Sequence, residues 1–468
     1  ALKDACVISL PPNSGIPNFV ARARAKISTA ANTMRFTQTR RTRVMRRFSH
    51  KEVSDFLGFS RKVTWEWLAH PLIQSRRENT AQGYSLDEIM LLRGLMQNRK
   101  QHQKRPTLHW RAPGDPLPVI TFSSQKGGTA KSMSAASLAA YCTLTYGLRV
   151  GLIDADPQAT SSLYFVDDTA EIAGLDVDTF TRFMGVPAPG QEPLRFPPKD
   201  LDRFWKTTPW PGLRIIPGGA PIQEADISMF LMARSADKSM RRVYRLLRDA
   251  LDRWEAAHPP RTQTRDLVDH DGNFREDIFR DALTETLDLV IIDSAPALTL
   301  SQLNTVTAAT TLVVPNTMRG FDLSTAQIYL SSLDDYLHFI GREPDPIVFP
   351  ERPSYILPTI VSTTGDVDIR QVGELYAHDP EIICPVFYAR SEAVANAARD
   401  YQSIYEYVPP PGRRRSTRDF LANANAVNDA LLTRAVPRLP SRGYANAFIA
   451  RTWPDGMVPP WTETEEPG

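Results

Sequence analysis

The stretch Gln-Lys-Gly-Gly-Thr-Ala-Lys-Ser, residues 125–132, constrains the fold of this chain more than any other segment. It follows an apolar run at 118–122, typical of a buried strand. It precedes an Ala-rich run at 132–146, typical of a helix that ends at Gly147. A glycine-rich loop between a strand and a helix N-terminus presents backbone N–H groups and the helix dipole to an anion. The pattern therefore predicts a phosphate-binding loop in an α/β fold.

The positions of this loop have separate expected roles in holding a nucleotide. Gly127 and Gly128 remove side chains where the backbone must approach a phosphate, and Thr129 continues the same turn. Lys131 is expected to reach the β- and γ-phosphates, and the Ser132 hydroxyl is expected to ligate Mg²⁺. The alternative for the loop alone is a glycine-bearing turn between strand and helix that binds nothing.

The loop departs from the common pattern G-x-x-x-x-G-K-[ST] in three ways. Gln125 stands at the first glycine and Ala130 at the last, although alanine disfavours positive φ. A second lysine, Lys126, lies near the start of the loop. It suits a charge that is offered to phosphates outside its own loop.

Two further apolar runs end in acids. Residues 148–158 include Asp154 and Asp156, and residues 287–296 include Asp293. Parallel strands buried on both faces have such continuous apolar runs, and functional residues gather at their carboxyl ends. Asp293 is then the Walker-B acid of the Mg²⁺ shell, and Asp156 is the candidate that orients or deprotonates the attacking water. Either acid alone would be interpreted as a helix N-cap or a turn residue.

The ordered motifs resemble the deviant Walker-A ATPases of the ParA type, which partition plasmids and chromosomes. Lys-Gly-Gly-x-x-Lys-Ser, Asp154-Ala155-Asp156-Pro157-Gln158 and Asp293-Ser294-Ala295-Pro296 carry the resemblance. Within about residues 117–432 it continues through Val313-Val314-Pro315, Phe321-Asp322-Leu323-Ser324-Thr325, Arg390-Ser391-Glu392-Ala393 and Ser403-Ile404-Tyr405-Glu406-Tyr407.

The resemblance implies a doubly wound, mostly parallel α/β sheet and a slow ATPase that uses ATP/ADP and Mg²⁺. It implies a homodimer with ATP between the subunits, in which Lys126 crosses to the partner's nucleotide. It also implies nonspecific DNA binding, a higher assembly on DNA, and a ParB-type centromere-binding partner that stimulates hydrolysis. Asp156 matches the water-activating acid and Asp293 the Walker-B acid. Ala130 replaces the usual glycine, which puts the hydrolysis rate in question more than nucleotide binding.

Composition fits a cytoplasmic protein without a membrane span, and the resemblance implies association with the nucleoid. The chain has 468 residues and three scattered cysteines, Cys6, Cys142 and Cys384, which form no zinc, iron–sulfur or disulfide pattern. No apolar stretch approaches the ~18 residues that a transmembrane helix needs. The start of the sequence lacks the charged-then-apolar pattern of a signal peptide.

The N-terminal part is basic and precedes a predicted helical unit. Residues 21–47 hold nine Arg or Lys and no acid. Such a run is often only a solvated helix face, but here it leads into capping-box spacings at Ser49–Glu52 and Ser85–Glu88. Gly58 supplies a turn between a helix that carries Val53, Phe56 and Leu57 and a second helix at 61–69.

This helical unit resembles the winged helix–turn–helix that precedes the ATPase in larger ParA-type proteins. Arg61, Lys62 and Thr64 are expected to face outward near the start of the second helix, where a recognition helix meets base edges. Arg76 and Arg77 begin a polar hairpin or wing at 76–84. A structural helical pair is the alternative. The expected role is operator binding for autoregulation.

A second DNA-binding surface is expected on the ATPase itself. By the resemblance, arginines near the Ser-Glu-Ala motif contact nonspecific DNA, and Arg390 matches that position best, with Arg370 and Arg399 as further candidates. Each could instead be a surface salt-bridge residue.

The predicted organisation is a P-loop ATPase domain with a doubly wound, mostly parallel sheet, preceded by an all-α winged helix–turn–helix domain. The expected segments are a basic arm at 1–47, the helix–turn–helix at 48–105, a linker at 106–117, the ATPase at 118–435 and a tail at 436–468. The polar insertion at 259–279 receives no role.

Of three other functional classes, one remains an alternative. A transcriptional repressor that only senses nucleotide is kept open by Ala130. A MinD-like membrane ATPase would need a basic amphipathic C-terminal helix, and the acidic, proline-bearing end argues against it. A nitrogenase-reductase relative would need cluster-ligating cysteines, and none of the three cysteines is suitably placed.

Overall fold

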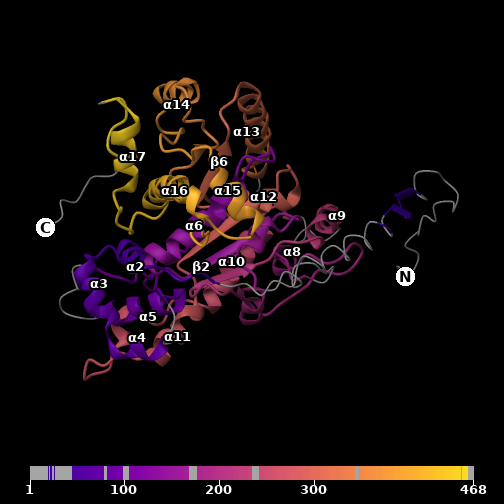
Figure 1. Cartoon of the computed structure of the whole chain (residues 1–468). Coiled ribbons are helices and arrows are strands. Elements are labelled where there is room, and N and C mark those ends of the chain that lie inside the picture. The colour runs from indigo at the N-terminus through magenta and orange to yellow at the C-terminus, as the bar shows by residue number, and fades with distance from the viewer. Residues whose placement is uncertain are drawn as a thin grey trace.

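A seven-stranded sheet forms the centre of the computed structural model (Figure 1). The structure describes residues 19–20, 22–23, 26, 45–77, 82–97, 105–167, 177–234, 242–342, 347–454 and 456–461. The strand order is β3-β4-β2-β5-β1-β6-β7. The strands are β1 (Val119–Phe122), β2 (Val150–Ala155), β3 (Lys206–Thr207), β4 (Leu213–Ile216), β5 (Leu289–Ser294), β6 (Thr311–Asn316) and β7 (Tyr355–Pro358).

All neighbouring strands run parallel except the short edge strand β3, which is antiparallel to β4. The inner strands β1, β2, β4 and β5 are buried along their whole length, as expected for parallel strands with helices on both faces. Asp293 of β5 lies between Phe122 of β1 and Asp154 of β2 in the strand register, so the three strands end at one level. This level holds the candidate site.

Alternate strand residues point to opposite faces and enter separate cores. On one face Ile120, Leu152 and Ile291 join a large core. Its helices are α2 (His50–Leu57), α3 (Arg61–Leu68), α4 (Pro71–Arg76), α5 (Leu86–Gln97), α6 (Lys131–Tyr146), α11 (Glu276–Glu285), α14 (Val367–His378), α15 (Glu392–Arg399), α16 (Arg414–Ala435) and α17 (Tyr444–Thr452).

On the other face Val119, Ile153 and Ile292 pack against α8 (Phe180–Phe183), α9 (Pro221–Ala233), α10 (Leu246–Ala257) and the 3₁₀ helix η3 (Pro198–Phe204). A third core at the β6 end joins α12 (Leu300–Thr307) and α13 (Gly320–Ile340). The remaining short elements are α7 (Thr160–Leu163), η5 (Thr264–Leu267) and η6 (Pro411–Arg413). None of the helices described is both long enough and apolar enough to cross a membrane.

The N-terminal helical unit, α2 to α5, forms much as its sequence predicts. Ser49 and Glu52 make a reciprocal capping box, and Gly58 ends α2 in the left-handed conformation with φ 74°. Ser60 caps α3, and Ser85 and Glu88 cap α5 through two hydrogen bonds of 2.7 and 3.1 Å. Of the basic arm before residue 45, the structure describes residues 19–20, 22–23 and 26. The tip of the predicted wing at 78–81 and residues 98–104 lie outside the described residues.

Two arginines, the buried Arg93 and the half-buried Arg442, join this helical unit to the end of α6. The Arg93 guanidinium donates to the carbonyl oxygens of Phe56 at 3.0 Å and Thr107 at 2.8 Å, and also to that of Leu144. Arg442 donates to the carbonyls of Phe56 and Thr145 at 3.2 and 2.7 Å. The C-terminal ends of α2 and α6 therefore meet at the same two cations, which complement the negative ends of the helix dipoles.

The insertion that received no role from its sequence packs against the same unit. The insertion runs into helix α11, which begins at Glu276. The Arg280 guanidinium of α11 forms an ion pair with Asp87 at the start of α5, with an Nη2–Oδ2 distance of 2.8 Å, and Glu276 binds Arg76 at 2.8 Å. Gly94 of α5 leaves room for the rings of Phe274 and Phe279, because a Cβ there would approach both to about 3 Å. Figure 1 shows α11 beside α4 and α5, at the end of the molecule opposite α13 and α14. The insertion is part of the joint between the two units.

The expected C-terminal tail is instead partly folded. Helix α17 packs on α16, and the Trp461 ring is buried, with its indole N–H donating to the Ala430 carbonyl at 2.8 Å. The Arg434 guanidinium lies 3.5 Å above that ring. Residues 436–461 thus extend the ATPase core, and the acidic residues after 461 lie outside the described part.

The predicted doubly wound, mostly parallel α/β fold is confirmed. The helical unit that precedes it is present, and its assignment as a winged helix–turn–helix stays a prediction.

Candidate nucleotide site

The loop between β1 and α6 has the shape that its glycines predict. Gly128 has φ 76°, and a Cβ placed on either Gly127 or Gly128 would meet no atom within 4 Å. The backbone of these residues is therefore open to a ligand. Thr129 and Lys131 are buried, and the Ser124 and Thr129 hydroxyls lie 3.0 Å apart beneath the loop.

Ala130 takes the strained conformation that the missing glycine implies. It has φ 63° and ψ 24°, in the left-handed region, immediately before the first residue of α6. Its carbonyl accepts hydrogen bonds from the Ser134 N–H at 2.9 Å and the Ser134 hydroxyl at 2.8 Å, which hold the residue in place. A left-handed alanine costs about 1–2 kcal/mol relative to the usual region.

Ala130→Gly is therefore expected to raise the free energy of unfolding by a few tenths to about 1 kcal/mol, because relief of strain outweighs the added entropy of the unfolded chain. Ala130→Val should lower it, since a β-branched residue tolerates positive φ even less. Urea denaturation of the three proteins measures the order. Equal stability of the glycine and valine variants would contradict strain at this position.

Asp293, at the end of β5, is fully buried beside the loop. Its Oδ2 accepts a hydrogen bond from the Ser161 hydroxyl at 2.5 Å, while its Oδ1 has no hydrogen-bond partner among the described residues. Burial raises the pKa of Asp293, against the opposing influence of the Lys131 charge and of hydrogen bonds from Ser161 and Ser132. A buried carboxylate oxygen without a partner, next to a lysine and a serine, fits a site that holds a divalent cation.

The two acids at the end of β2 have different surroundings. Asp154 accepts from the N–H and hydroxyl of Ser162, both at 2.7 Å, and from the Asp156 N–H at 3.1 Å. Burial, followed by the nearby charge of Asp293, raises the pKa of Asp154 to about 8. Asp156 is mostly buried and accepts from the Gln158 N–H at 2.8 Å. Asp154 organises the loop after β2, a role that its place in the motif did not reveal.

Lys126 is paired within its own chain. Its ammonium contacts the Asp322 carboxylate, whose other oxygen accepts from the Thr317 hydroxyl. Asp322 lies in the first turn of α13 and is buried, whereas the Lys126 side chain is 44% exposed. The Asn316 amide donates to the Asp322 carbonyl at 3.2 Å, so the acid is fixed to the end of β6. The motif Phe321–Thr325 was recognised from the sequence, but this partner for Lys126 was not.

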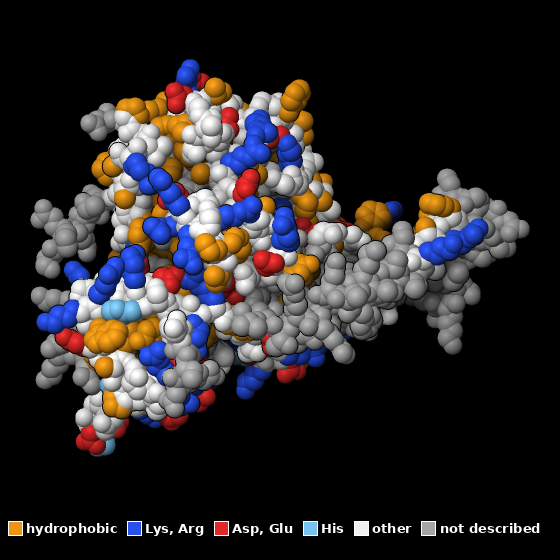
Figure 2. Space-filling view, viewed as in Figure 1, with side chains coloured by type: hydrophobic (Ala, Val, Ile, Leu, Met, Phe, Trp, Pro, Cys, Tyr) orange, Lys and Arg blue, Asp and Glu red, His pale blue; other side chains and the backbone are white. Residues whose placement is uncertain are grey.

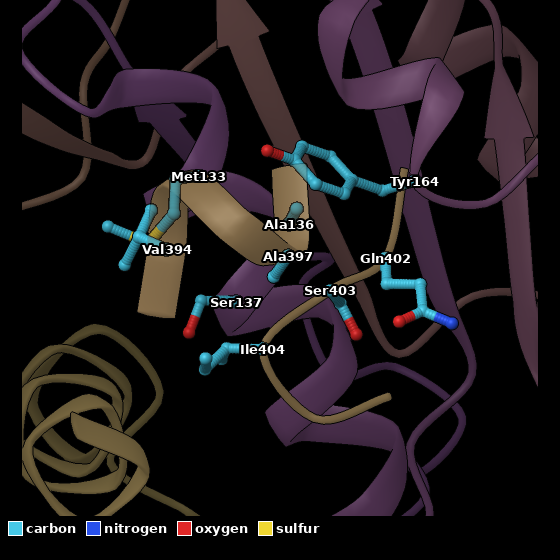
Figure 3. A pocket seen from close by; sticks show the side chains of 9 residues that line it. All are labelled: Met133, Ala136, Ser137, Tyr164, Val394, Ala397, Gln402, Ser403 and Ile404. Atoms are coloured by element: carbon cyan, nitrogen blue, oxygen red, sulfur yellow. The ribbon is translucent and has the colours of Figure 1, made fainter. Parts of the chain in front are cut away.

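A small pocket joins the start of α6 to the segment that contains the Ser-Glu-Ala motif (Figure 3). Met133, Ala136 and Ser137 of α6 face Val394 and Ala397 of α15 across it. Its other lining residues are Tyr164, Gln402, Ser403 and Ile404. Its lining is mainly apolar, so it does not resemble a nucleotide site. It marks the place where α6, the helix after the phosphate loop, packs against α15.

The predicted recognition helix α3 presents a different face from the one expected. Arg61 and Lys62 are exposed, as predicted, but Thr64 is buried and its hydroxyl donates to the Ser60 carbonyl at 3.1 Å. The expectation that Thr64 faces outward is wrong, because the inward side of α3 is made by Thr64, Trp67 and Leu68. Trp65 is exposed in its place.

The two wing arginines have partners inside the protein. Arg76 binds Glu276, and the Arg77 guanidinium lies 4.5 Å above the Tyr84 ring. The other DNA candidates are exposed: Arg370 on α14, Arg390 just before α15 and Arg399 at its end. Figure 2 shows Lys and Arg side chains spread over the face that carries α15 and α16, with a few acidic groups among them.

Comparison with known proteins places the chain in a family. Residues 120–375 match the family model described as the CobQ/CobB/MinD/ParA nucleotide binding domain. A Sinorhizobium fredii protein named "Putative replication protein A" is 25% identical over 397 residues, which cover 82% of this chain and 85% of that protein. Protein SopA of Escherichia coli K12 is 28% identical over 315 residues, covering 65% and 68% of the two chains.

Solved structures give a weaker likeness. One titled "Partition Protein" aligns with a TM-score of 0.47 at 16% identity, over 87% of this chain and 99% of that chain. McdA of Cyanothece with bound ATP aligns with a TM-score of 0.45 at 17% identity, over 68% and 97% of the two chains. Because the family model spans more than half of the 468 residues, the predicted resemblance is confirmed, and the chain belongs to the CobQ/CobB/MinD/ParA nucleotide-binding family.

Proposed function

We propose that this chain is a DNA-partition ATPase that hydrolyses ATP slowly and binds DNA according to its nucleotide state. The observation that carries the proposal is the group at the ends of β1 and β5. Buried Lys131 and the open turn of Gly127 and Gly128 lie beside Asp293, whose Oδ1 has no partner among the described residues. The names of the relatives, a SopA protein and a replication protein, support partition as the biological role.

The residues of the site would have separate roles in binding the phosphates, the metal ion and the attacking water. Lys131 and the loop N–H groups from Gly127 to Ser132 would hold the phosphates, and Ser132 with Asp293 would hold Mg²⁺. The cation supplies charge that neutralises the phosphate oxygens. Asp156 would orient the attacking water, while Asp154 keeps the loop after β2 in position through Ser162.

Dimerisation would add the remaining lysine. In the proposed ATP-bound homodimer, Lys126 leaves Asp322 and reaches the phosphates of the other subunit. The closed dimer would bind nonspecific DNA through Arg370, Arg390 and Arg399, and could assemble further on it. A ParB-type centromere-binding protein would stimulate hydrolysis and so release the DNA. The helical unit would separately bind an operator through α3, with Arg61 and Lys62 foremost.

DNA binding across nucleotide states tests this proposal. With ATP and Mg²⁺, binding to random DNA is expected to exceed that with ADP or without nucleotide. The logarithm of this affinity should fall linearly with the logarithm of salt concentration, because phosphate contacts release counterions. Fluorescence anisotropy on random DNA and on DNA from upstream of the gene measures both modes. Equal affinity for random DNA in all three states would refute the nucleotide switch.

A repressor that senses nucleotide with little turnover is the second candidate. The left-handed Ala130 favours it, since strain in the phosphate loop could slow hydrolysis without preventing binding. Steady-state phosphate release in the presence of DNA separates the two. Turnover that rises with DNA and a centromere-binding partner supports the ATPase, and turnover at background level supports the repressor.

A further inference from the structure

The outward face of α3 combines two cations with an exposed indole and one exposed acid, Glu66. Arg61 and Lys62 lie in the first turn, and Trp65 follows on the same side one turn later. Trp65 is 61% exposed, whereas Thr64, Trp67 and Leu68 bury the opposite side of the helix. All eight tryptophans lie in the described part of the chain, and Trp65 is the one left mostly in solvent.

Trp65 is positioned as well as exposed. The edge of the His50 ring from α2 packs against it, with ring centroids 5.2 Å apart and planes at 71°. The turn between the helices is fixed by the left-handed Gly58 and by the Ser60 cap. The indole is therefore held from one side while its opposite surface is free to meet a ligand. Tryptophan is enriched at binding interfaces, where its ring buries a large apolar area.

The positive charge at the start of α3 suits DNA as the partner of this face. Neither Arg61 nor Lys62 has an ion-pair partner among the described residues, and both lie at the positive end of the α3 dipole. An α-helix, about 10–12 Å across, fits the major groove of DNA, which is about 12 Å wide. In that groove thymine offers an apolar methyl group, which apolar side chains contact, and guanine offers acceptors to arginine. A cationic helix start followed by an apolar ring matches this chemistry.

We propose that Trp65 is a sequence-reading residue of the operator, whose indole packs against the C5-methyl group of a thymine while Arg61 contacts bases or phosphates one helical turn away. This inference rests on operator binding in the proposed function. Base recognition is thereby assigned to the Trp65 ring, whereas the sequence predicted Thr64 for that role.

The test uses the full chain and a duplex that the wild-type protein enriches from a random pool. Each thymine of the enriched duplex is replaced in turn by deoxyuridine, which removes only the methyl group. At one or two positions the wild-type affinity is expected to fall about three- to fivefold, as for the loss of one buried methyl. Trp65→Ala should lower affinity for the thymine duplex about 10- to 100-fold. It should also abolish the difference between thymine and deoxyuridine at those positions.

Trp65→Phe, which keeps an apolar ring, should retain part of the thymine preference. Tyr336→Ala, which removes another exposed aromatic ring from α13, is the matched control and should leave operator affinity unchanged. Thermal melts of all variants establish that each is folded. ATP-dependent binding to random DNA should be the same for Trp65→Ala and wild type, because that mode is assigned to the ATPase surface.

Two results overturn the inference alone: unchanged operator affinity for Trp65→Ala, or a deoxyuridine effect in this variant equal to that in wild type. A variant that changes its oligomeric state but not its operator affinity would show that the indole contacts another protein chain, and this also overturns the inference. If the wild-type protein enriches no sequence at all, operator binding itself fails, and the inference fails with it.

Discussion

Lys126→Gln is expected to lower ATP turnover by about 100-fold or more, the usual effect of losing a group that stabilises charge in the transition state. It should also weaken ATP-dependent binding to random DNA, because the glutamine carries no charge to offer across the dimer. Operator binding should remain near wild type, since α3 lies in a separate unit from the phosphate loop. Phosphate release, together with anisotropy on both DNA types, measures the three activities.

Lys206→Gln is a suitable control for this variant. Lys206 is exposed on the edge strand β3, away from the ends of β1 and β5, and its loss removes the same charge without touching the site. Equal loss of operator and random-DNA binding in Lys126→Gln would contradict two separate DNA-binding surfaces. Normal turnover would contradict a catalytic role for this lysine.

Arg93→Met is expected to lower the free energy of unfolding by about 3–5 kcal/mol, because each buried carbonyl group left without a hydrogen-bond donor costs about 1–3 kcal/mol. Arg93 is completely buried, and burial, with a smaller effect of the Arg442 charge, lowers its pKa. The buried carbonyl groups of Thr107 and Leu144 would lose the donor that Arg93 supplies, and the Phe56 carbonyl would keep only Arg442. Chemical denaturation measures the loss.

Arg105→Met provides the comparison, since Arg105 is exposed and should change stability by less than about 0.5 kcal/mol. A second measurement tests whether Arg93 connects the helical unit to the ATPase domain or only stabilises the core. If it connects them, Arg93→Met should make the helical unit more susceptible to proteolysis than the sheet. Wild-type stability in this variant would contradict a structural role for the arginine.

Local patterns allowed much of the nucleotide site to be predicted. The phosphate loop, the acids at the strand ends and the capping boxes depend on residues a few positions apart, so short-range spacing carries the information. The conformation of Ala130 also follows locally, because the turn requires positive φ whichever residue stands there.

Features that depend on distant residues could not be predicted. Lys126 meets Asp322 across 196 positions, and Arg280 meets Asp87 across 193. No periodicity links such pairs, so the insertion at 259–279 had no visible role until α11 was placed beside α5. The error at Thr64 has a different cause. Successive residues of a helix differ by about 100° around its axis, so in the eight residues of α3 a small error in the assumed inward face exchanges Thr64 for Trp65.

The contact between Lys126 and Asp322 bears on how sharply the proposed switch can respond. If Lys126 had no partner in the free subunit, each dimer would gain two new charge contacts and would tend to persist. Since each lysine already has an acid within its own chain, dimerisation exchanges one negative partner for another, and much of the Coulomb energy cancels. The free energy of dimerisation would then depend on the small difference between these two Coulomb energies. A single phosphate group, present in ATP and lost on hydrolysis, would be enough to change the sign of that free energy.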